Sequence, residues 1–232
     1  MLFSAPPKSM RLTLRVLSHL LSYPSVELLA HLGELAQALR DEAVLDGQRT
    51  DELEALMHRL ERLPSMLVQA EYVELFDRGR STALNLFEHV HGDSRDRGPA
   101  MIDLIQTFEK AGLMLRTEEL PDHLPVLLEF ASTQPPAQAR EFLGEIAHIV
   151  RVIFSALQKR QSPYASVLAA VLELAGHKAE AVPVPVEEAM DESWEEPPVF
   201  GGCSTQGQAK PGQPQPIQLV RKAVSSSQGV QA

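Results

Sequence analysis

Apolar residues recur at spacings of three and four through the first three quarters of this chain, and that period constrains the fold more than any other feature. It is the pattern of helices that each bury one face. A clear example is the stripe formed by Leu53, Leu56, Met57, Leu60 and Leu63. The sequence shows no alternating strand pattern and no internal repeat. It therefore predicts an all-α fold, a single-domain helical bundle.

Local signals place some of the helix ends. The stripe from Leu28 to Leu39 predicts one helix, with Ser25 as its N-cap. Asp122 follows Pro121 and is expected to cap a short helix that runs through Phe130. The stretch 72–98 is predicted to begin as an amphipathic helix and to end in a loop dense with Arg, Asp, His and Gly. Loops with so many charged residues usually have a function.

Composition excludes several classes of protein. The net charge of −10 argues against nucleic-acid binding, which needs Lys and Arg to neutralise phosphates, and it favours a basic partner. The single cysteine, Cys203, excludes an intramolecular disulfide framework. No segment reaches the ~20 apolar residues that a membrane helix needs. Arg15 and His19 interrupt the Leu-rich N-terminal stretch, so we expect the first core helix of a cytoplasmic protein there and no signal peptide.

The character of the sequence changes near Ala179. Acidic residues and prolines come first, and Gly, Gln, Ser and further prolines follow. Such a segment buries too little apolar surface to offset its ordering entropy. We therefore expect a helical domain over residues 1–178 and a flexible, disordered acidic and Pro/Gly/Gln-rich tail over 179–232.

Histidines and carboxylates raise the question of a metal site. His89 and His91 lie two apart in a stretch with flanking carboxylates, and Asp122 precedes His123. The chain offers no paired thiolates and no His-Glu-x-x-His helix, so ordinary loop and capping roles are preferred and no bound metal or other cofactor is expected. No nucleophile elbow or phosphate-binding glycine loop occurs either, so the chain is predicted not to be an enzyme. A small helical metal-binding protein is kept as an alternative.

Positive charge gathers between residues 78 and 97, at Arg78, Arg80, Arg95 and Arg97. One interpretation is a binding site for a phosphate or carboxylate, because guanidinium groups bind such anions with two hydrogen bonds. The other is pairing inside the loop with Asp77, Asp93 and Asp96. The interleaved signs favour the second interpretation.

Several stretches of the chain resemble the NarJ-type nitrate reductase assembly chaperones, in the wider group that includes the TorD and DmsD chaperones. They are Leu-Ser-Tyr-Pro at 21–24, Tyr-Val-Glu-Leu-Phe-Asp-Arg-Gly-Arg at 72–80, Leu-Phe-Glu-His-Val-His-Gly-Asp-Ser-Arg-Asp-Arg-Gly at 86–98, Glu-Leu-Pro-Asp-His-Leu-Pro at 119–125 and Glu-Glu-Pro-Pro-Val-Phe-Gly at 195–201. The similarity extends from about Leu14 to Ala175 and resumes in the tail.

The resemblance implies an all-helical, cytoplasmic, system-specific chaperone that makes and breaks no bond. Its expected partner is the N-terminal region of the catalytic (alpha) subunit of respiratory nitrate reductase, held until the molybdenum cofactor is inserted and the complex matures. Molybdenum cofactor-delivery proteins are further candidate partners, and both a monomer and a dimer stay open. The alternative within this system is a permanent structural (delta) subunit of the reductase.

A client helix lying in an apolar groove is the expected binding mode. The candidate client-binding residues are Glu71, Tyr72, Glu74, Leu75, Phe76, Phe87, Glu119, Asp122 and His123. Their carboxylates would attract a basic peptide. The candidate loop toward a partner or the cofactor consists of Arg78, Arg80, His89, His91, Arg95, Asp96 and Arg97. The tail segment from Ile217 to Val220 is expected to fold back into the groove or to act as a second binding element.

Overall fold

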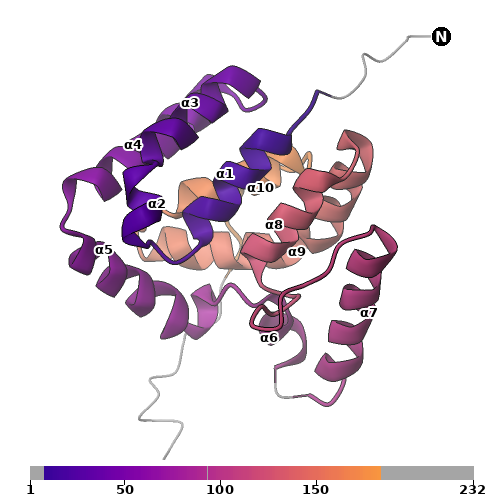
Figure 1. The fold of residues 1–232 in the computed structure, drawn as a ribbon. Coiled ribbons are helices and arrows are strands. Elements are labelled where there is room, and N and C mark those ends of the chain that lie inside the picture. Colours follow the sequence, from indigo (N-terminus) through magenta and orange to yellow (C-terminus); the bar gives the residue numbers. More distant parts are fainter. Residues whose placement is uncertain (1–7, 93, 184–232) are drawn as a thin grey trace, which may run out of the picture. The chain divides into compact units, whose positions relative to one another are not determined.

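The computed structural model describes residues 8–92 and 94–183, all within the compact unit Met1–Glu187 (Figure 1). Asp93 and the tail from Val184 onward, including the segment from Ile217 to Val220, lie outside the described residues. The predictions made for that tail therefore stay predictions.

Helices account for nearly all regular structure in the described part of the chain, and no strand occurs there. Asn85 and His123 form an isolated bridge. The all-α bundle is thereby confirmed. The elements are α1 (Arg11–Leu21), α2 (Val26–Ala30), α3 (Leu32–Glu42), α4 (Gly47–Arg62), α5 (Ser65–Tyr72), a π-helical turn (Val73–Asp77), a 3-10 turn (Arg80–Thr82), α6 (Leu86–His91), α7 (Arg97–Lys110), α8 (Leu124–Thr133), α9 (Pro136–Lys159) and α10 (Ala165–Leu174).

Helix α1 lies in the middle of the bundle. It packs against α8 and α3, and α9 packs against α10 (Figure 1). Leu14, Leu17 and Leu21 are fully buried, so α1 is the core helix that the sequence predicts. The carboxylate of Glu42, at the end of α3, accepts hydrogen bonds from the backbone N–H groups of Leu12 (3.2 Å) and Thr13 (2.7 Å). A side chain about thirty residues away thus satisfies the N-terminal amides of α1.

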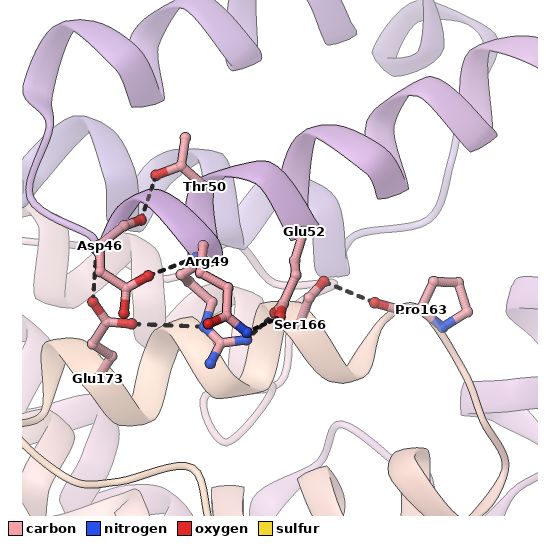
Figure 2. A network of polar contacts seen from close by, with 8 residues as sticks. Asp46, Arg49, Thr50, Glu52, Pro163, Ser166 and Glu173 are labelled. Carbon is pink, nitrogen blue, oxygen red and sulfur yellow. Dashed lines mark hydrogen bonds and ion pairs between the residues drawn. The ribbon is translucent and has the colours of Figure 1, made fainter.

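A polar network fastens the start of α4 to α10 (Figure 2). The Asp46 side chain caps α4 by accepting from the Arg49 N–H at 2.7 Å, and its own N–H donates to Glu173 at 2.9 Å. The Arg49 guanidinium lies 3.6 Å from the second Glu173 oxygen and also pairs with Glu52. These contacts fix the α3–α4 hairpin on the bundle.

Two helix boundaries differ from the prediction. Ser25 does cap a helix, by accepting from the Leu28 N–H at 3.1 Å, but the stripe from Leu28 to Leu39 is split into α2 and α3. The break falls at His31, whose ring nitrogen takes a hydrogen bond with the Glu27 carbonyl at 2.8 Å and whose backbone leaves the helical region. The apolar period continues across the break, which is why the sequence does not reveal it.

The stretch predicted as a charged loop contains the 3-10 turn, α6 and the start of α7. Asp122 does not cap α8, since His123 occupies that N-cap without a side-chain bond. Its carboxylate instead accepts from the Phe87 N–H, at the start of α6, at 3.1 Å. A cap supplied from a distant segment gives α6 no signal in its own sequence, and the prediction of a loop was wrong for that reason.

No helix within residues 8–92 and 94–183 is long and apolar enough to cross a membrane.

Replacing Leu17 by Ala is expected to lower the free energy of unfolding by about 2–5 kcal/mol, because it leaves a cavity where α1 meets the core. Leu12→Ala on the same helix is the matched control. Leu12 is 42% exposed, so its loss should change the free energy by less than about 0.5 kcal/mol. Urea unfolding followed by circular dichroism measures both, and equal effects would contradict this assignment of the core.

Candidate functional site

An open groove of about 730 Å³ lies between α5 with its π turn and the segment that joins α9 to α10. Its surface is mostly apolar. The residues that line it are Tyr23, Arg59, Gln69, Ala70, Glu71, Val73, Glu74, Leu75, Arg78, Arg160, Ser162, Pro163 and Tyr164. A groove of this size accommodates several side chains of a bound segment.

A cluster of aromatic rings adjoins this groove, and two of its members, Tyr23 and Tyr164, line the groove. Tyr72 and Phe76 lie with ring centroids 4.9 Å apart, and Tyr164 packs edge-on against Phe76 at 5.2 Å. Burial raises the pKa of Tyr164 to about 12, so its hydroxyl stays neutral. Tyr23 packs edge-on against Tyr72 at 5.8 Å and is 51% exposed, so half of its surface is available at the groove edge.

The charges at the groove edge are already paired. Arg59 and Glu71 form two hydrogen bonds, at 2.8 and 3.1 Å, and Arg78 lies 3.1 Å from Glu74. Both carboxylates were predicted to attract a basic peptide. Because each has a guanidinium partner and Arg160 also lines the groove, the groove itself presents no net negative charge.

A second hollow, of about 420 Å³, lies beside the groove, between the end of α1, the segment before α8, and α8 itself. Glu118, Glu119 and Glu129 line it, and no Lys or Arg does. These carboxylates form no ion pair with any described residue. Tyr23 lines both this acidic hollow and the groove, so the two are adjacent.

A third, smaller hollow of about 240 Å³ lies behind the π turn. Tyr72, Phe76 and Asp77 line it on one side, and Glu88 and His123 on the other. Tyr72 and Phe76 are only 5% and 4% exposed, so they support the groove from beneath. His123 is half-buried, which lowers the pKa of its imidazole and favours the neutral ring.

Asp122 connects the loop regions around these hollows. Its side chain is fully buried, its carboxylate accepts from the Phe87 N–H at 3.1 Å, and the Arg97 guanidinium lies 3.7 Å away. Among the described residues, the second carboxylate oxygen has no hydrogen-bond partner. Backbone bonds reinforce the junction, from the Leu86 N–H to the Asp122 carbonyl at 3.0 Å and from the Leu124 N–H to the Leu84 carbonyl at 2.9 Å. Asp122 therefore acts inside the protein, not on a surface where a client peptide could lie.

Burial raises the pKa of the Asp122 carboxyl, against the opposing effects of the Phe87 amide and Arg97. The site therefore disfavours the ionised carboxylate. The free-energy cost of burying that charge is tolerated where the carboxylate fixes a particular local structure.

The arginines of the predicted loop have different surroundings. Arg97 pairs with Glu88 at 3.4 Å and with Asp122, and Arg78 pairs with Glu74. Internal pairing of these two is therefore present, but with partners other than the predicted Asp77, Asp93 and Asp96. Arg80 and Arg95 are exposed, as is Asp96, and for these arginines a grip on an anion stays a prediction.

The predicted loop histidines have structural contacts. His89 takes a hydrogen bond with the Ala83 carbonyl at 2.8 Å, and His91 packs edge-on against Phe87, with ring centroids 5.5 Å apart. Across residues 8–92 and 94–183, no group of three or more His, Cys, Asp or Glu side chains is arranged to hold a metal ion.

Most of the predicted client-binding residues lie around these adjoining hollows. Glu71, Glu74 and Leu75 line the groove, Glu119 lines the acidic hollow, and His123 lies between the second and third hollows. Phe87 is half-buried on α6 and lines none of the three. Tyr23 and Tyr164 line the groove but were not among the predicted site residues, although Tyr23 lies in the Leu-Ser-Tyr-Pro stretch at 21–24.

Comparison with known proteins identifies the family. A family model described as nitrate reductase delta subunit matches residues 27–170. The chain belongs to this family. The nitrate reductase molybdenum cofactor assembly chaperone NarJ of Escherichia coli K12 is 40% identical over 183 residues, which cover 79% of this chain and 77% of NarJ. NarW of the same organism, named as a probable chaperone of this kind, is 42% identical over 195 residues, covering 79% of this chain and 80% of NarW.

A solved structure supports the fold. A redox enzyme maturation protein from Archaeoglobus fulgidus superimposes with a TM-score of 0.51, covering 76% of this chain and 98% of that protein. At 21% identity this similarity concerns the fold alone.

Within the described residues, the stretches 21–24, 72–80, 86–98 and 119–125 that resemble NarJ-type chaperones meet around the groove and the hollows. The Tyr72 hydroxyl donates to the Leu21 carbonyl at 2.7 Å, which joins the stretch 72–80 to the stretch 21–24. Asp122 joins 119–125 to 86–98 through the Phe87 amide. Segments far apart in the chain thus build one region of the surface.

Asp122→Asn tests the cost of the buried charge. An asparagine keeps an oxygen that accepts from the Phe87 N–H, but it has no charge to bury. Because the folded-state pKa of Asp122 is raised, the wild type should lose stability relative to the variant as the pH rises above about 4 and through that raised pKa. Urea unfolding of both proteins between acidic and neutral pH measures this difference. If the stability of the wild type relative to the variant instead rose with pH, Arg97 and the amide would outweigh burial.

Proposed function

We propose that this protein is an assembly chaperone for a respiratory nitrate reductase and that it acts by binding, without making or breaking a bond. The observation that supports this most directly is the open apolar groove, which adjoins an acidic hollow at the half-exposed Tyr23. An open apolar groove between helical segments is the kind of surface on which an amphipathic helix binds. The relatives named as molybdenum cofactor assembly chaperones supply the biological setting.

The proposed occupant is the N-terminal segment of the catalytic (alpha) subunit, bound as an amphipathic helix. Its apolar face would lie in the groove against Ala70, Val73 and Leu75. Basic side chains of the same segment would lie over the acidic hollow, because the carboxylates there are unpaired within the described structure, whereas those of the groove are paired. Charge would thus set the direction in which the client lies, and apolar contact would supply most of the affinity.

Holding this segment would delay assembly of the catalytic subunit until its molybdenum cofactor is in place. The chaperone would then leave, which distinguishes it from a permanent delta subunit of the finished enzyme. We place this action in the cytoplasm, where no membrane segment is required of the protein.

Calorimetric titration with the N-terminal peptide of the cognate catalytic subunit tests the proposal. We expect micromolar or tighter binding with a negative heat-capacity change, the mark of apolar burial. Tyr23→Ala should weaken binding roughly tenfold, the scale of an aromatic anchor at an interface. Met114→Ala is the control, because Met114 is 93% exposed and lines none of the hollows.

Absence of peptide binding by the wild type at low salt would contradict the proposal. Stoichiometric co-purification of the chain with the active, mature reductase would support the permanent-subunit alternative instead.

A further inference from the structure

The wall of the groove contains an unusual turn of helix. Helix α5 continues directly into the π turn Val73–Asp77, in which the Arg78 N–H donates to the Val73 carbonyl at 3.1 Å. A π turn accommodates one more residue than an α turn, and such turns are frequent at functional sites. Here Glu74 and Leu75 line the groove, while Phe76 and Asp77 line the hollow behind it.

A buried hydroxyl closes this turn. Thr82 is fully buried, and its hydroxyl donates to the Leu75 carbonyl; the Gly79 carbonyl lies 3.2 Å from the same oxygen. The Thr82 N–H donates to the Gly79 carbonyl at 3.1 Å, so the chain doubles back onto the end of the helix. A Cβ on Gly79 would lie 2.5 Å from the Leu75 carbonyl oxygen and would also overlap the Thr82 hydroxyl. Residue 79 must therefore be glycine for Thr82 to reach Leu75.

Removal of the hydroxyl would leave the Leu75 carbonyl without this donor. In an ordinary α-helix that carbonyl accepts from the N–H four residues on, which is that of Gly79. The π turn itself is closed by the bond from the Arg78 N–H to the Val73 carbonyl, so loss of the hydroxyl would act on the turn through the Leu75 carbonyl. If that carbonyl turned toward the Gly79 N–H, the peptide plane after Leu75 would rotate, and Leu75 would leave the position at which it lines the groove wall.

We propose that Thr82 is a positioning residue for client binding: its hydroxyl holds the turn Val73–Asp77 in the π form that presents Leu75 and Glu74 to the client. This inference rests on the proposed function, since it concerns the same groove. Thr82 itself lies beneath the surface and does not touch the client.

A pair of substitutions separates positioning from stability. Thr82→Val keeps the shape of the side chain and removes the hydroxyl, whereas Thr82→Ser keeps the hydroxyl and removes a buried methyl group. We expect calorimetric titration with the client peptide to show roughly 5- to 30-fold weaker binding for Thr82→Val, the effect of one poorly satisfied carbonyl. Thr82→Ser should bind as the wild type does, although it also loses stability.

Ser132→Ala serves as a control for the loss of a buried hydroxyl elsewhere. The Ser132 hydroxyl donates to the Glu129 carbonyl at 2.6 Å within α8, and Ser132 lines none of the three hollows described above. The Ser132→Ala protein should be less stable than the wild type and should bind the client peptide with unchanged affinity. Equal affinities of Thr82→Val and Thr82→Ser would overturn the inference, and wild-type protein that fails to bind the peptide would overturn the proposed function instead.

If Thr82→Val does not fold, hydrogen exchange on the wild-type protein tests the same inference. The Arg78 amide reports on the π turn, because it donates across that turn to Val73. Client peptide should slow its exchange, since binding stabilises the π form. Unchanged or faster exchange at saturating peptide would overturn the inference.

Discussion

The buried carboxylate of Asp122 is the contact on which the arrangement of the site depends. It accepts from the first turn of α6, and Arg97 from the start of α7 approaches it, while the neighbouring backbone bridges Asn85 to His123. A charge in a fully buried position is costly unless it is hydrogen-bonded. Here it fixes a short helix of six residues that would not form alone in water. This junction positions the residues that line the second and third hollows.

The division of charge around the groove explains how one surface could recognise a segment that is both apolar and basic. Guanidinium groups neutralise the carboxylates at the groove edge, so apolar contact dominates there. The carboxylates that form no ion pair with any described residue lie next to it, beyond Tyr23. Exposed ion pairs of this kind contribute little to stability. The π turn adds a second constraint, because it faces the groove on one side and the third hollow on the other.

Much of the fold could be predicted from periodicity, since the Leu-rich N-terminal stretch identifies α1, the stripe from Leu53 to Leu63 identifies α4, and Ser25 identifies the start of α2. Local sequence signals did not predict the helix starts that are capped by a side chain from a distant part of the chain. Asp122 caps α6 and Glu42 caps the start of α1, and neither partner is visible in the helix that it caps. Some residues that line the groove and the acidic hollow could be predicted, because Glu74, Leu75 and Glu119 lie in stretches that resemble a known family. Tyr164 was missed because its role arises from packing against Phe76, which no local pattern records.

The most direct test of the central claim is site-specific photo-crosslinking to the full-length catalytic subunit. A benzophenone amino acid would replace Ala70, an exposed residue that lines the groove, or Ile102, which is 56% exposed on α7 and lines none of the hollows. The account predicts a crosslink from position 70 to the N-terminal segment of the client and none from position 102. Crosslinks from position 102 alone, or to a region of the client far from its N-terminus, would contradict it.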